Sequence, residues 1–228
     1  MNAIVQCDNL SRRYGTAETS FYAVNAVSLA ISPGEFLSLS GPSGSGKTTL
    51  LNLLSGLDTP TEGEVTLAGQ QLGGLDRDAL ADLRLNRIGF VFQAYNLIPV
   101  LSARENVEFI MQLQGVAAKA RRGQAEAMLE EVGLGGLEER RPGQLSGGQQ
   151  QRVAIARAMA SAPAIVFADE PSANLDSAAT DGLLALMRQL NENRGMTFCI
   201  ASHVPRVIDY TRRRVRMRDG RIEADERA

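Results

Sequence analysis

Short apolar runs recur along the chain, and they predict the strands of a buried sheet. Runs of four or five mainly apolar residues occupy positions 36–40, 88–92, 165–168 and 197–201. Each run is too short for a core helix but long enough for a strand that is covered on both faces. Between the runs, apolar residues recur at the spacing of amphipathic helices. This alternation predicts an α/β fold built on a mostly parallel sheet.

A second pattern, in which apolar and polar positions alternate, predicts strands with one exposed face. It is weak at residues 4–9 and clearer at 27–31 and 65–67, close in sequence to the first buried strand. These segments predict a small antiparallel sheet beside the main one. Near the other end, alternating residues 215–222 enclose an Asp-Gly pair, which predicts a closing hairpin.

The middle of the chain predicts helices. Ser102 and Glu105 have the spacing of a capping box and predict a helix start. A second helical pattern follows and stops at a glycine. We therefore expect residues 94–144 to form an α-helical subdomain inserted into the α/β core. The 228 residues suit a single domain, with residues 1–93 and 145–228 as its core.

Composition and charge narrow the classes of partner. Hydrophobic residues make up 44% and charged residues 22%, which is typical of a globular protein. The 24 basic and 26 acidic residues give a net charge of −2, so we expect no nucleic-acid partner. One basic cluster is expected to be a solvated hairpin edge, with contact to anionic lipid or nucleic acid as a minor alternative. It comprises Arg212, Arg213, Arg214, Arg216 and Arg218.

Cysteine usage and hydropathy indicate a chain from a reducing compartment. Cys7 and Cys199 are far apart and match no disulfide or metal-site spacing. Cys199 lies in an apolar strand pattern, so we expect a buried, unreactive thiol. No signal peptide is recognisable, and no apolar run approaches the roughly 18–20 residues that span a bilayer. We expect any membrane role to work through another polypeptide.

The sequence GPSGSGKT at residues 41–48 matches the phosphate-binding consensus G-x-x-x-x-G-K-[ST]. A predicted strand precedes it and a predicted helix at 49–54 follows, so a helix N-terminus would face the phosphates. Lys47 can reach the β- and γ-phosphates, and the Thr48 hydroxyl can ligate Mg²⁺. The alternative is an ordinary glycine-rich turn, but such a turn would not require a strand directly before it and a helix directly after it. The predicted nucleotide-binding residues here are Gly41, Pro42, Ser43, Gly44, Ser45, Gly46, Lys47, Thr48 and Thr49.

Four polar residues stand at the ends of predicted strands, where open α/β sheets bind ligands. Asp169 follows an apolar strand directly, as expected for a carboxylate that holds Mg²⁺. Its neighbour Glu170 would point elsewhere and could act as a general base for an attacking water. Gln93 could touch both Mg²⁺ and that water, and His203 could contact the γ-phosphate. The alternatives are solvated turns or structural residues, which the phosphate loop disfavours.

A second anion-binding sequence begins at Ser146. The residues Ser-Gly-Gly would open a helix there, and their N–H groups could bind phosphate. Because one nucleotide does not need two distant phosphate clamps, we expect two copies of the chain to pair head to tail. A glycine-rich helix cap would explain only the glycines. In such a pair, the second copy would contribute Ser146, Gly147, Gly148 and Gln149 to each ATP.

These motifs, in this order, resemble those of the ATP-binding-cassette (ABC) ATPases, the nucleotide-binding subunits of ABC transporters. The resemblance covers nearly the whole chain and includes LSGGQ at residues 145–149. It implies a RecA-like P-loop NTPase core that binds ATP and Mg²⁺ and hydrolyses ATP. The catalytic residues that it implies are Lys47, Gln93, Glu170 and His203, and the metal contacts are Thr48, Gln93 and Asp169.

Two further contacts are implied only by the resemblance. Family members have a dimer-contact loop, which here would include Asp176. They also stack an aromatic ring from an early strand on adenine. Tyr14 is the expected match, and Tyr22 is its competitor.

Three stretches are similar to the branch of the family that serves lipoprotein-releasing, macrolide-exporting and cell-division transporters. They are GPSGSGKTTLLNLLSGLDTPTEGEV, GFVFQAYNLIPVLSARENV and LSGGQQQRVAIARA. The resemblance implies a cytoplasmic ATPase on the cytoplasmic face of the inner membrane. It would drive a separate membrane permease, with a periplasmic adaptor reached through that permease as a further option.

Several points stay open at this level. The apolar cluster of Tyr95, Leu97, Ile98 and Pro99 is either a docking surface for the permease or local core packing. A regulatory, non-transporting cassette is an alternative function. A soluble ABC ATPase that acts on nucleic acid or ribosomes is a second, less favoured alternative, because the chain has no sustained heptads and only one cassette. The transported substrate is not encoded in this chain.

Overall fold

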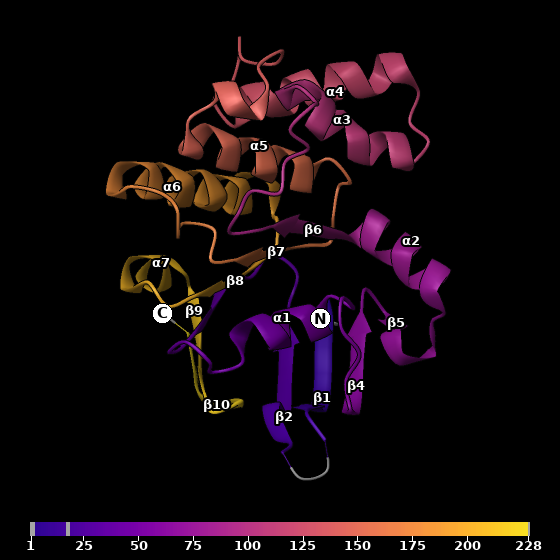
Figure 1. The fold of residues 1–228 in the computed structure, drawn as a ribbon, viewed down its shortest axis with the longest axis vertical. Helices are drawn as coiled ribbons and strands as arrows, with labels where there is room; N and C mark the ends of the chain where they lie inside the picture. The colour runs from indigo at the N-terminus through magenta and orange to yellow at the C-terminus, as the bar shows by residue number, and fades with distance from the viewer. Residues whose placement is uncertain (1–2, 17–18, 228) are drawn as a thin grey trace.

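The computed structural model describes residues 3–16 and 19–227 and contains two β-sheets (Figure 1). The larger sheet has the order β10-β9-β3-β8-β7-β6, and its neighbours are parallel except β9 and β10. This confirms the expected mostly parallel sheet. The predicted outer limits of the core, residues 1 and 228, lie outside the described residues. The strands are β3 (Phe36–Ser40), β6 (Ile88–Val91), β7 (Ile165–Asp169), β8 (Phe198–Ser202), β9 (Arg213–Arg218) and β10 (Arg221–Arg227).

The smaller sheet is antiparallel, as predicted, with the order β2-β1-β4-β5. Its strands are β1 (Val5–Tyr14), β2 (Phe21–Ile31), β4 (Glu62–Leu67) and β5 (Gln70–Gln71). Strand β2 contains a bulge. Arg12 pairs with Val24 and Arg13 pairs with Tyr22, so Ala23 is an extra residue. This bulge lies against the phosphate loop and shapes the site described below.

The helices cover both faces of the main sheet (Figure 1). Helix α1 and the antiparallel sheet lie on one side, and α5 and α6 lie on the other, with α3 and α4 packed beyond α5. The helices are α1 (Lys47–Leu54), α2 (Arg77–Arg87), α3 (Ala103–Leu113), α4 (Ala118–Glu131), α5 (Gly147–Met159), α6 (Ser177–Arg194) and α7 (Pro205–Tyr210), with 3₁₀ turns η1 (Leu72–Gly74) and η2 (Pro142–Gln144).

Two hydrophobic clusters fill the space on either side of the main sheet. Strand β3 is buried at every position and contributes to both: Phe36 belongs to one cluster, and Leu37 and Leu39 belong to the other. This alternation follows from the two-residue period of a strand. Cys7 and Cys199 are both buried, and burial raises the pKa of the Cys7 thiol to about 12. The expectation of an unreactive buried Cys199 agrees with this position.

The local signals for helix starts and turns are confirmed at two places. Ser102 and Glu105 form the predicted capping box at the start of α3. Asp219 and Gly220 connect β9 to β10 with φ values of 47° and 76°, the left-handed pair that an Asp-Gly hairpin turn requires. The division into a core and a subdomain at residues 94–144 stays a prediction. Within the described residues, no helix is both long and apolar enough to cross a membrane.

Two helices had no counterpart in the sequence prediction. Helix α2 is polar overall, and its apolar stripe is short: Leu83 is buried and Leu80 is partly buried against the core. Helix α7 spans six residues and buries only Val207. Both are polar, surface-lying segments whose helical form depends on the elements around them.

Candidate active site

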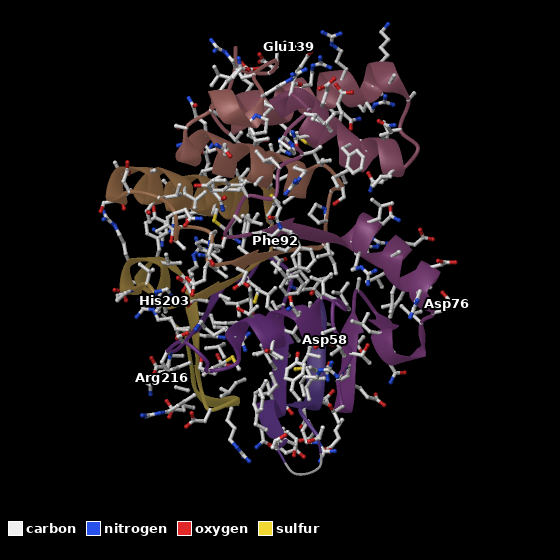
Figure 2. All side chains as sticks on the ribbon, viewed as in Figure 1. Asp58, Asp76, Phe92, Glu139, His203 and Arg216 are labelled. Carbon is white, nitrogen blue, oxygen red and sulfur yellow. The ribbon has the colours of Figure 1, made fainter. Side chains whose placement is uncertain are left out.

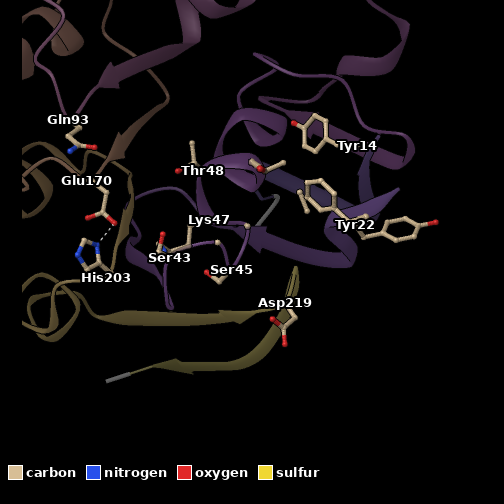
Figure 3. A pocket seen from close by; sticks show the side chains of 15 residues that line it. Tyr14, Tyr22, Ser43, Ser45, Lys47, Thr48, Gln93, Glu170, His203 and Asp219 are labelled. Atoms are coloured by element: carbon tan, nitrogen blue, oxygen red, sulfur yellow. Dashed lines mark hydrogen bonds and ion pairs between the residues drawn. The ribbon is translucent and has the colours of Figure 1, made fainter. Parts of the chain in front are cut away.

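A cleft of about 770 Å³ opens beside the phosphate loop, at the carboxyl ends of the parallel strands (Figure 3). It brings together residues from five parts of the chain: β1 and β2, the phosphate loop, the segment after β6, the ends of β7 and β8, and the turn between β9 and β10. The predicted site residues in its lining are Tyr14, Tyr22, Ser43, Gly44, Ser45, Gly46, Lys47, Thr48, Thr49, Gln93, Glu170 and His203.

The phosphate loop joins β3 to α1, and close packing requires glycine at two of its positions, 41 and 46. Gly46 has a φ of 98°, and a Cβ atom there would lie 2.2 Å from the carbonyl oxygen of Ala23. That carbonyl comes from the bulge in β2. Gly41 has a φ of 145°, and its Cβ would lie 2.2 Å from the Met217 carbonyl oxygen. The loop is therefore clamped between the two sheets by backbone contacts that exclude any side chain.

The polar groups of the loop are arranged for an anion. Lys47 is buried, and its Nζ donates hydrogen bonds of 2.8 Å to the Gly41 carbonyl and 3.0 Å to the Pro42 carbonyl. The ammonium thus lies over the loop. The Ser45 hydroxyl is buried with no hydrogen-bond partner among the described residues. A buried hydroxyl without a partner is costly, and a phosphate oxygen would satisfy it.

Thr48 and Asp169 meet at the start of α1. The Thr48 hydroxyl donates to Oδ1 of Asp169 over 3.2 Å. Burial raises the pKa of Asp169, and the nearby Glu170 raises it further, while Thr48 and Lys47 act in the opposite direction. A desolvated carboxylate beside a hydroxyl is a pair of hard oxygen donors, which fits Mg²⁺. Among the described residues, no group of three or more His, Cys, Asp and Glu side chains forms a metal cage, so phosphate and water would supply the other ligands.

Glu170 is held at both of its carboxylate oxygens. Its Oε1 lies 2.7 Å from Nδ1 of His203, and its Oε2 accepts a 3.1 Å hydrogen bond from the Ser202 hydroxyl. The residue has a φ of 45°, a left-handed conformation that is strained for a residue with a side chain. The side chain is 15% exposed. Sequence reasoning predicted Glu170 and His203 but missed Ser202, because a serine inside an apolar strand gives no signal of its partner.

Gln93 follows β6, lines the cleft and is exposed. Figure 3 shows its side chain near that of Glu170. Its backbone carbonyl accepts a 2.9 Å hydrogen bond from Asn174, which the sequence did not single out. The next residues are fixed from α5: Arg157 donates to the carbonyls of Tyr95 (2.9 Å) and Asn96 (2.5 Å). The segment after Gln93 is thus tied to two other parts of the chain.

Three aromatic side chains line the end of the cleft away from Glu170. Tyr14 directs its hydroxyl to Asp58 and lies closer to the phosphate loop in Figure 3 than Tyr22, whose ring extends away from the loop. Phe21 is 60% exposed and also lines the cleft, as does Asp219. Neither was predicted. The arrangement favours Tyr14 over Tyr22 as the ring that faces a bound base.

The predicted residues Ser146, Gly147, Gly148, Gln149 and Asp176 lie outside this cleft in the described chain. Ser146 is exposed and caps α5: its Oγ accepts from the Gln149 N–H (3.3 Å), and the Gln149 side chain accepts from the Ser146 N–H (2.9 Å). Asp176 caps α6 by accepting from the Ala179 N–H over 2.7 Å. One copy of the chain therefore does not bring its two anion-binding sequences together.

Comparison with known proteins agrees with this geometry. The family model described as ABC transporter matches residues 24–173. The lipoprotein-releasing system ATP-binding protein LolD of Anaeromyxobacter dehalogenans is 48% identical, over 97% of this chain and 93% of that protein. The macrolide export ATP-binding/permease protein MacB of Syntrophobacter fumaroxidans is 44% identical over 99% of this chain, which spans only 32% of that protein.

A solved structure shows the same fold. It is the ATP-binding cassette MJ0796 in a dimeric, post-hydrolysis state bound to ADP and Pi, with a TM-score of 0.89 and 42% identity over 98% of both chains. Family match, full-length relatives and shared fold all agree with the phosphate loop, the strand-end carboxylates and the LSGGQ segment. This chain belongs to the ABC transporter family and is one of its ATP-hydrolysing, ATP-binding cassettes.

Proposed function

We propose that two copies of this chain close head to tail around two ATP molecules and that hydrolysis reopens them. The observation that carries this proposal is the separation of the phosphate-binding groups within one copy. The phosphate loop, Glu170 and His203 share one cleft, whereas Ser146 begins an exposed helix end outside it. A second copy can supply the missing half of each site. The dimeric structures of MJ0796 support the same arrangement here.

In this pair, each residue of the cleft has a distinct binding role. The N–H groups at residues 41–48 surround the phosphates, and Lys47 moves its hydrogen bonds from the loop carbonyls to the β- and γ-phosphate oxygens. Tyr14 stacks on adenine. From the other copy, the Ser146 hydroxyl can still donate, because in the cap it only accepts. Asp176 at the start of α6 lies in the contact between copies.

Thr48 and Asp169 are the residues that would hold Mg²⁺, with Gln93 at the edge of the cleft as a further oxygen donor. When bound, the ion would offset negative charge on the β- and γ-phosphate oxygens. The 3.2 Å contact between the Thr48 hydroxyl and Asp169 places both donors on the same side of the phosphate loop.

Glu170 is proposed as the general base of hydrolysis. A water between its carboxylate and the γ-phosphorus gives a proton to the carboxylate as the water oxygen attacks in line. The bond from the γ-phosphorus to the bridging β-phosphate oxygen breaks, and ADP and inorganic phosphate are released. His203 and Ser202 hold the carboxylate in place. His203 also reaches the γ-phosphate when the two copies close.

The test of this proposal is the mass of the Glu170→Gln variant in MgATP, measured by light scattering. The amide keeps the shape of the carboxylate but cannot accept the proton, so ATP stays intact and the dimer should accumulate. Without nucleotide the same variant should be a monomer. A variant that stays monomeric under all conditions and hydrolyses ATP at the wild-type rate would contradict the proposal.

A matched pair of serines adds a control. In the Glu170→Gln background, Ser146→Ala should lower the dimer fraction because the contact to the γ-phosphate is lost. Ser102→Ala removes a capping box of the same kind at the start of α3, where the serine is buried. Both changes cost about 1 kcal/mol of helix capping. Only the first should therefore affect dimerisation.

We further propose that a groove beside Gln93 binds a membrane permease. The groove has a volume of about 440 Å³ and is lined by aromatic and aliphatic side chains together with Arg84 and Arg157. Phe109 and Leu57 at its rim are 36% and 48% exposed, and such exposed apolar surface indicates a binding site. MacB is named as an ATP-binding/permease protein, which supports a permease segment as the occupant.

For the segment at residues 95–99, the sequence allowed two interpretations, core packing and a docking surface, and different residues fit each one. Leu97 packs on the hydrophobic core, whereas Ile98 and Asn96 line the groove. An Asn96→Cys variant should therefore crosslink to a co-expressed permease. Phe109→Glu should abolish that crosslink while ATP hydrolysis by the isolated cassette stays unchanged. Crosslinking that survives Phe109→Glu would place the permease elsewhere.

The likeness to LolD and MacB supports lipoprotein release or export as the driven process, on the cytoplasmic face of the inner membrane. A periplasmic adaptor would act through the permease. The regulatory, cell-division type of cassette has no observation of its own in its favour. The basic cluster offers little free charge for nucleic acid, because Arg212, Arg214, Arg216 and Arg218 each lie within 4.0 Å of a carboxylate. Figure 2 shows Arg216, an exposed residue of β9, at the surface of the molecule.

A further inference from the structure

Tyr14 is held by two charged residues that do not line the nucleotide cleft. Its hydroxyl donates to Oδ2 of Asp58 over 2.7 Å. Arg12 Nη2 lies 2.9 Å from the other carboxylate oxygen, Oδ1. The guanidinium carbon of Arg12 lies 4.7 Å from the centre of the Tyr14 ring, which is cation–π geometry. Arg12, Asp58 and Tyr14 thus form a closed set of three contacts, here called the Tyr14 support.

The sequence explains how the support forms. Arg12 and Tyr14 are two positions apart on β1, so their side chains emerge on the same face of the strand. Asp58 comes from the turn after α1, where its Oδ1 also accepts a 2.8 Å hydrogen bond from the Thr59 N–H. Figure 2 shows Asp58 beside α1 and β1. The support therefore connects the antiparallel sheet to the helix that carries the phosphate loop.

The three contacts restrict both rotatable bonds of the tyrosine. The bond to Asp58 fixes the direction of the hydroxyl, and Arg12 covers one face of the ring, so the opposite face is the one left for a planar base. The side chains of Arg12 and Asp58 are only 26% and 24% exposed, so solvent and salt screen their charges less than on an open surface. The Phe21 ring, 6.0 Å from Tyr14, borders the same space.

We propose that Arg12 and Asp58 are positioning residues that orient Tyr14 for stacking on the adenine of a bound nucleotide. They touch the ring and each other, and they lie outside the lining of the cleft. The proposal rests on the proposed function, because it takes Tyr14 as the adenine contact. A ring that is already oriented loses less conformational freedom on binding. The support should therefore strengthen binding of the adenosine part and leave phosphate binding unchanged.

The test compares MgADP with magnesium pyrophosphate, which lacks adenosine. Dissociation constants are measured by titration calorimetry for ADP and by competition for pyrophosphate. Asp58→Ala, Tyr14→Phe and Arg12→Ala should each weaken ADP binding about 3- to 10-fold, the effect of one hydrogen bond or ion pair. Pyrophosphate affinity should not change. Arg13→Ala, at the neighbouring exposed arginine of β1, is the matched control and should bind both ligands like wild type.

A double variant gives the readout that a purely structural role would not produce. Asp58→Ala already removes the hydrogen bond that Tyr14→Phe removes, so the double variant should bind ADP no more weakly than Asp58→Ala alone. Additive losses, or equal losses for ADP and pyrophosphate, would overturn the positioning role. Tyr14→Phe keeps the aromatic ring and should keep the fold. ADP and pyrophosphate binding can therefore still be compared in Tyr14→Phe if Asp58→Ala is unstable.

Tyr14→Ala separates this inference from the function on which it rests. If Tyr14→Ala binds ADP like wild type, the adenine contact itself is wrong, and the proposed orientation of the nucleotide fails with it. If Tyr14→Ala weakens ADP binding while Asp58→Ala and Tyr14→Phe do not, the nucleotide orientation stands and only the positioning role is wrong.

Discussion

At the scale of single residues, the phosphate loop shows why a motif needs particular residue types. Gly44 and Gly46 both have positive φ, at 79° and 98°, but their surroundings differ. A Cβ on Gly46 would meet the Ala23 carbonyl at 2.2 Å, whereas a Cβ on Gly44 would have no atom within 4 Å. The consensus G-x-x-x-x-G-K-[ST] requires glycine at position 46 but allows any residue at position 44. Because their tertiary contacts differ, substitution of the two glycines should lower the free energy of unfolding by different amounts.

This difference gives a prediction for stability. Gly46→Ala should lower the free energy of unfolding by about 2–4 kcal/mol, because the bulge of β2 must move in addition to the backbone strain. Gly44→Ala should cost only about 1 kcal/mol, which is the strain alone. Urea denaturation without nucleotide measures both. Equal losses for the two variants would show that the contact with Ala23 does not constrain the loop.

Glu170, the proposed general base, shows at the same scale how neighbouring residues hold a carboxylate. Its sequence neighbour Asp169 and its spatial partners Ser202 and His203 all come from the ends of buried strands. The two carboxylates have different partners: Asp169 accepts from Thr48, whereas Glu170 contacts Ser202 and His203. The two adjacent carboxylates can therefore serve different purposes, as their order after the strand suggested.

At the scale of elements, α5 connects the Ser146 cap at one end to the segment after Gln93 at the other. Arg157 in its last turn is half-buried, and its two hydrogen bonds go to the backbone carbonyls of Tyr95 and Asn96. Burial lowers the pKa of this arginine. Its charge is directed at carbonyls, so the helix and the loop should move as one unit.

Removal of this arginine should destabilise the fold. Arg157→Ala leaves two acceptors without their donor and should lower the free energy of unfolding by about 1–3 kcal/mol. Arg122→Ala on α4, at an arginine whose side chain is 60% exposed, should change it by less than about 0.5 kcal/mol. Chemical denaturation compares the two. An Arg157→Ala variant as stable as Arg122→Ala would mean that the loop does not depend on α5.

The edge of the main sheet offers a pH-dependent test. Arg213 on β9 is buried and pairs with Asp225 on β10 over 2.7 Å, and this contact is the main reason that the pKa of Asp225 is lowered from 3.8. A lowered pKa means that the carboxylate stabilises the fold fully above its unfolded pKa of about 3.9, and that this stability is lost as pH falls through the native pKa.

Asp225→Asn should therefore cost about 1–2 kcal/mol at pH 7, because the buried arginine loses a charged partner. The difference from wild type should shrink as the pH falls below about 4. Urea denaturation between pH 3 and 7 measures it, with Glu226→Gln on the same strand as the control. A difference that grows at low pH would have the wrong sign for this ion pair.

At the scale of the whole molecule, the proposed dimer makes a prediction about mixtures. Ser146→Arg and Glu170→Gln should each be inactive as pure proteins, because every site then contains one defect. In a mixed pair, one site receives Glu170 from the first variant and Ser146 from the second, so that site is intact. The other site carries both defects. A 1:1 mixture should recover about one quarter of wild-type ATP hydrolysis, since half of the pairs are mixed.

Phosphate release from the mixture, compared with each variant alone, measures this recovery. Activity equal to the sum of the separate variants would mean that each copy builds its own complete site. As a control, a mixture of Glu170→Gln with Lys47→Ala should stay inactive. Each change damages the cleft of the copy that carries it, so both sites of a mixed pair contain a defect.

The large features of this fold were predictable because they depend on local chemistry. Buried strands such as β3 and β8 are short, mainly apolar runs, and the capping box at Ser102 is a contact between residues three apart. Helix α2 was missed because it is polar overall and its apolar stripe is short, with Leu83 buried and Leu80 partly buried. Ser202 and Asn174 were missed at the site for a related reason: both are common polar residues whose importance depends on a distant partner.

By itself, the sequence determined the phosphate loop, the strand-end carboxylates, the second anion-binding helix start and the family, because each depends on residues that are close along the chain. Only the tertiary structure decided which distant groups meet them. The bulge at Ala23 against Gly46, the bond from Ser202 to Glu170 and the bond from Tyr14 to Asp58 join residues up to 44 positions apart. The physical reason is that hydrogen bonds and steric contacts act over a few ångströms in space, whatever the separation in sequence.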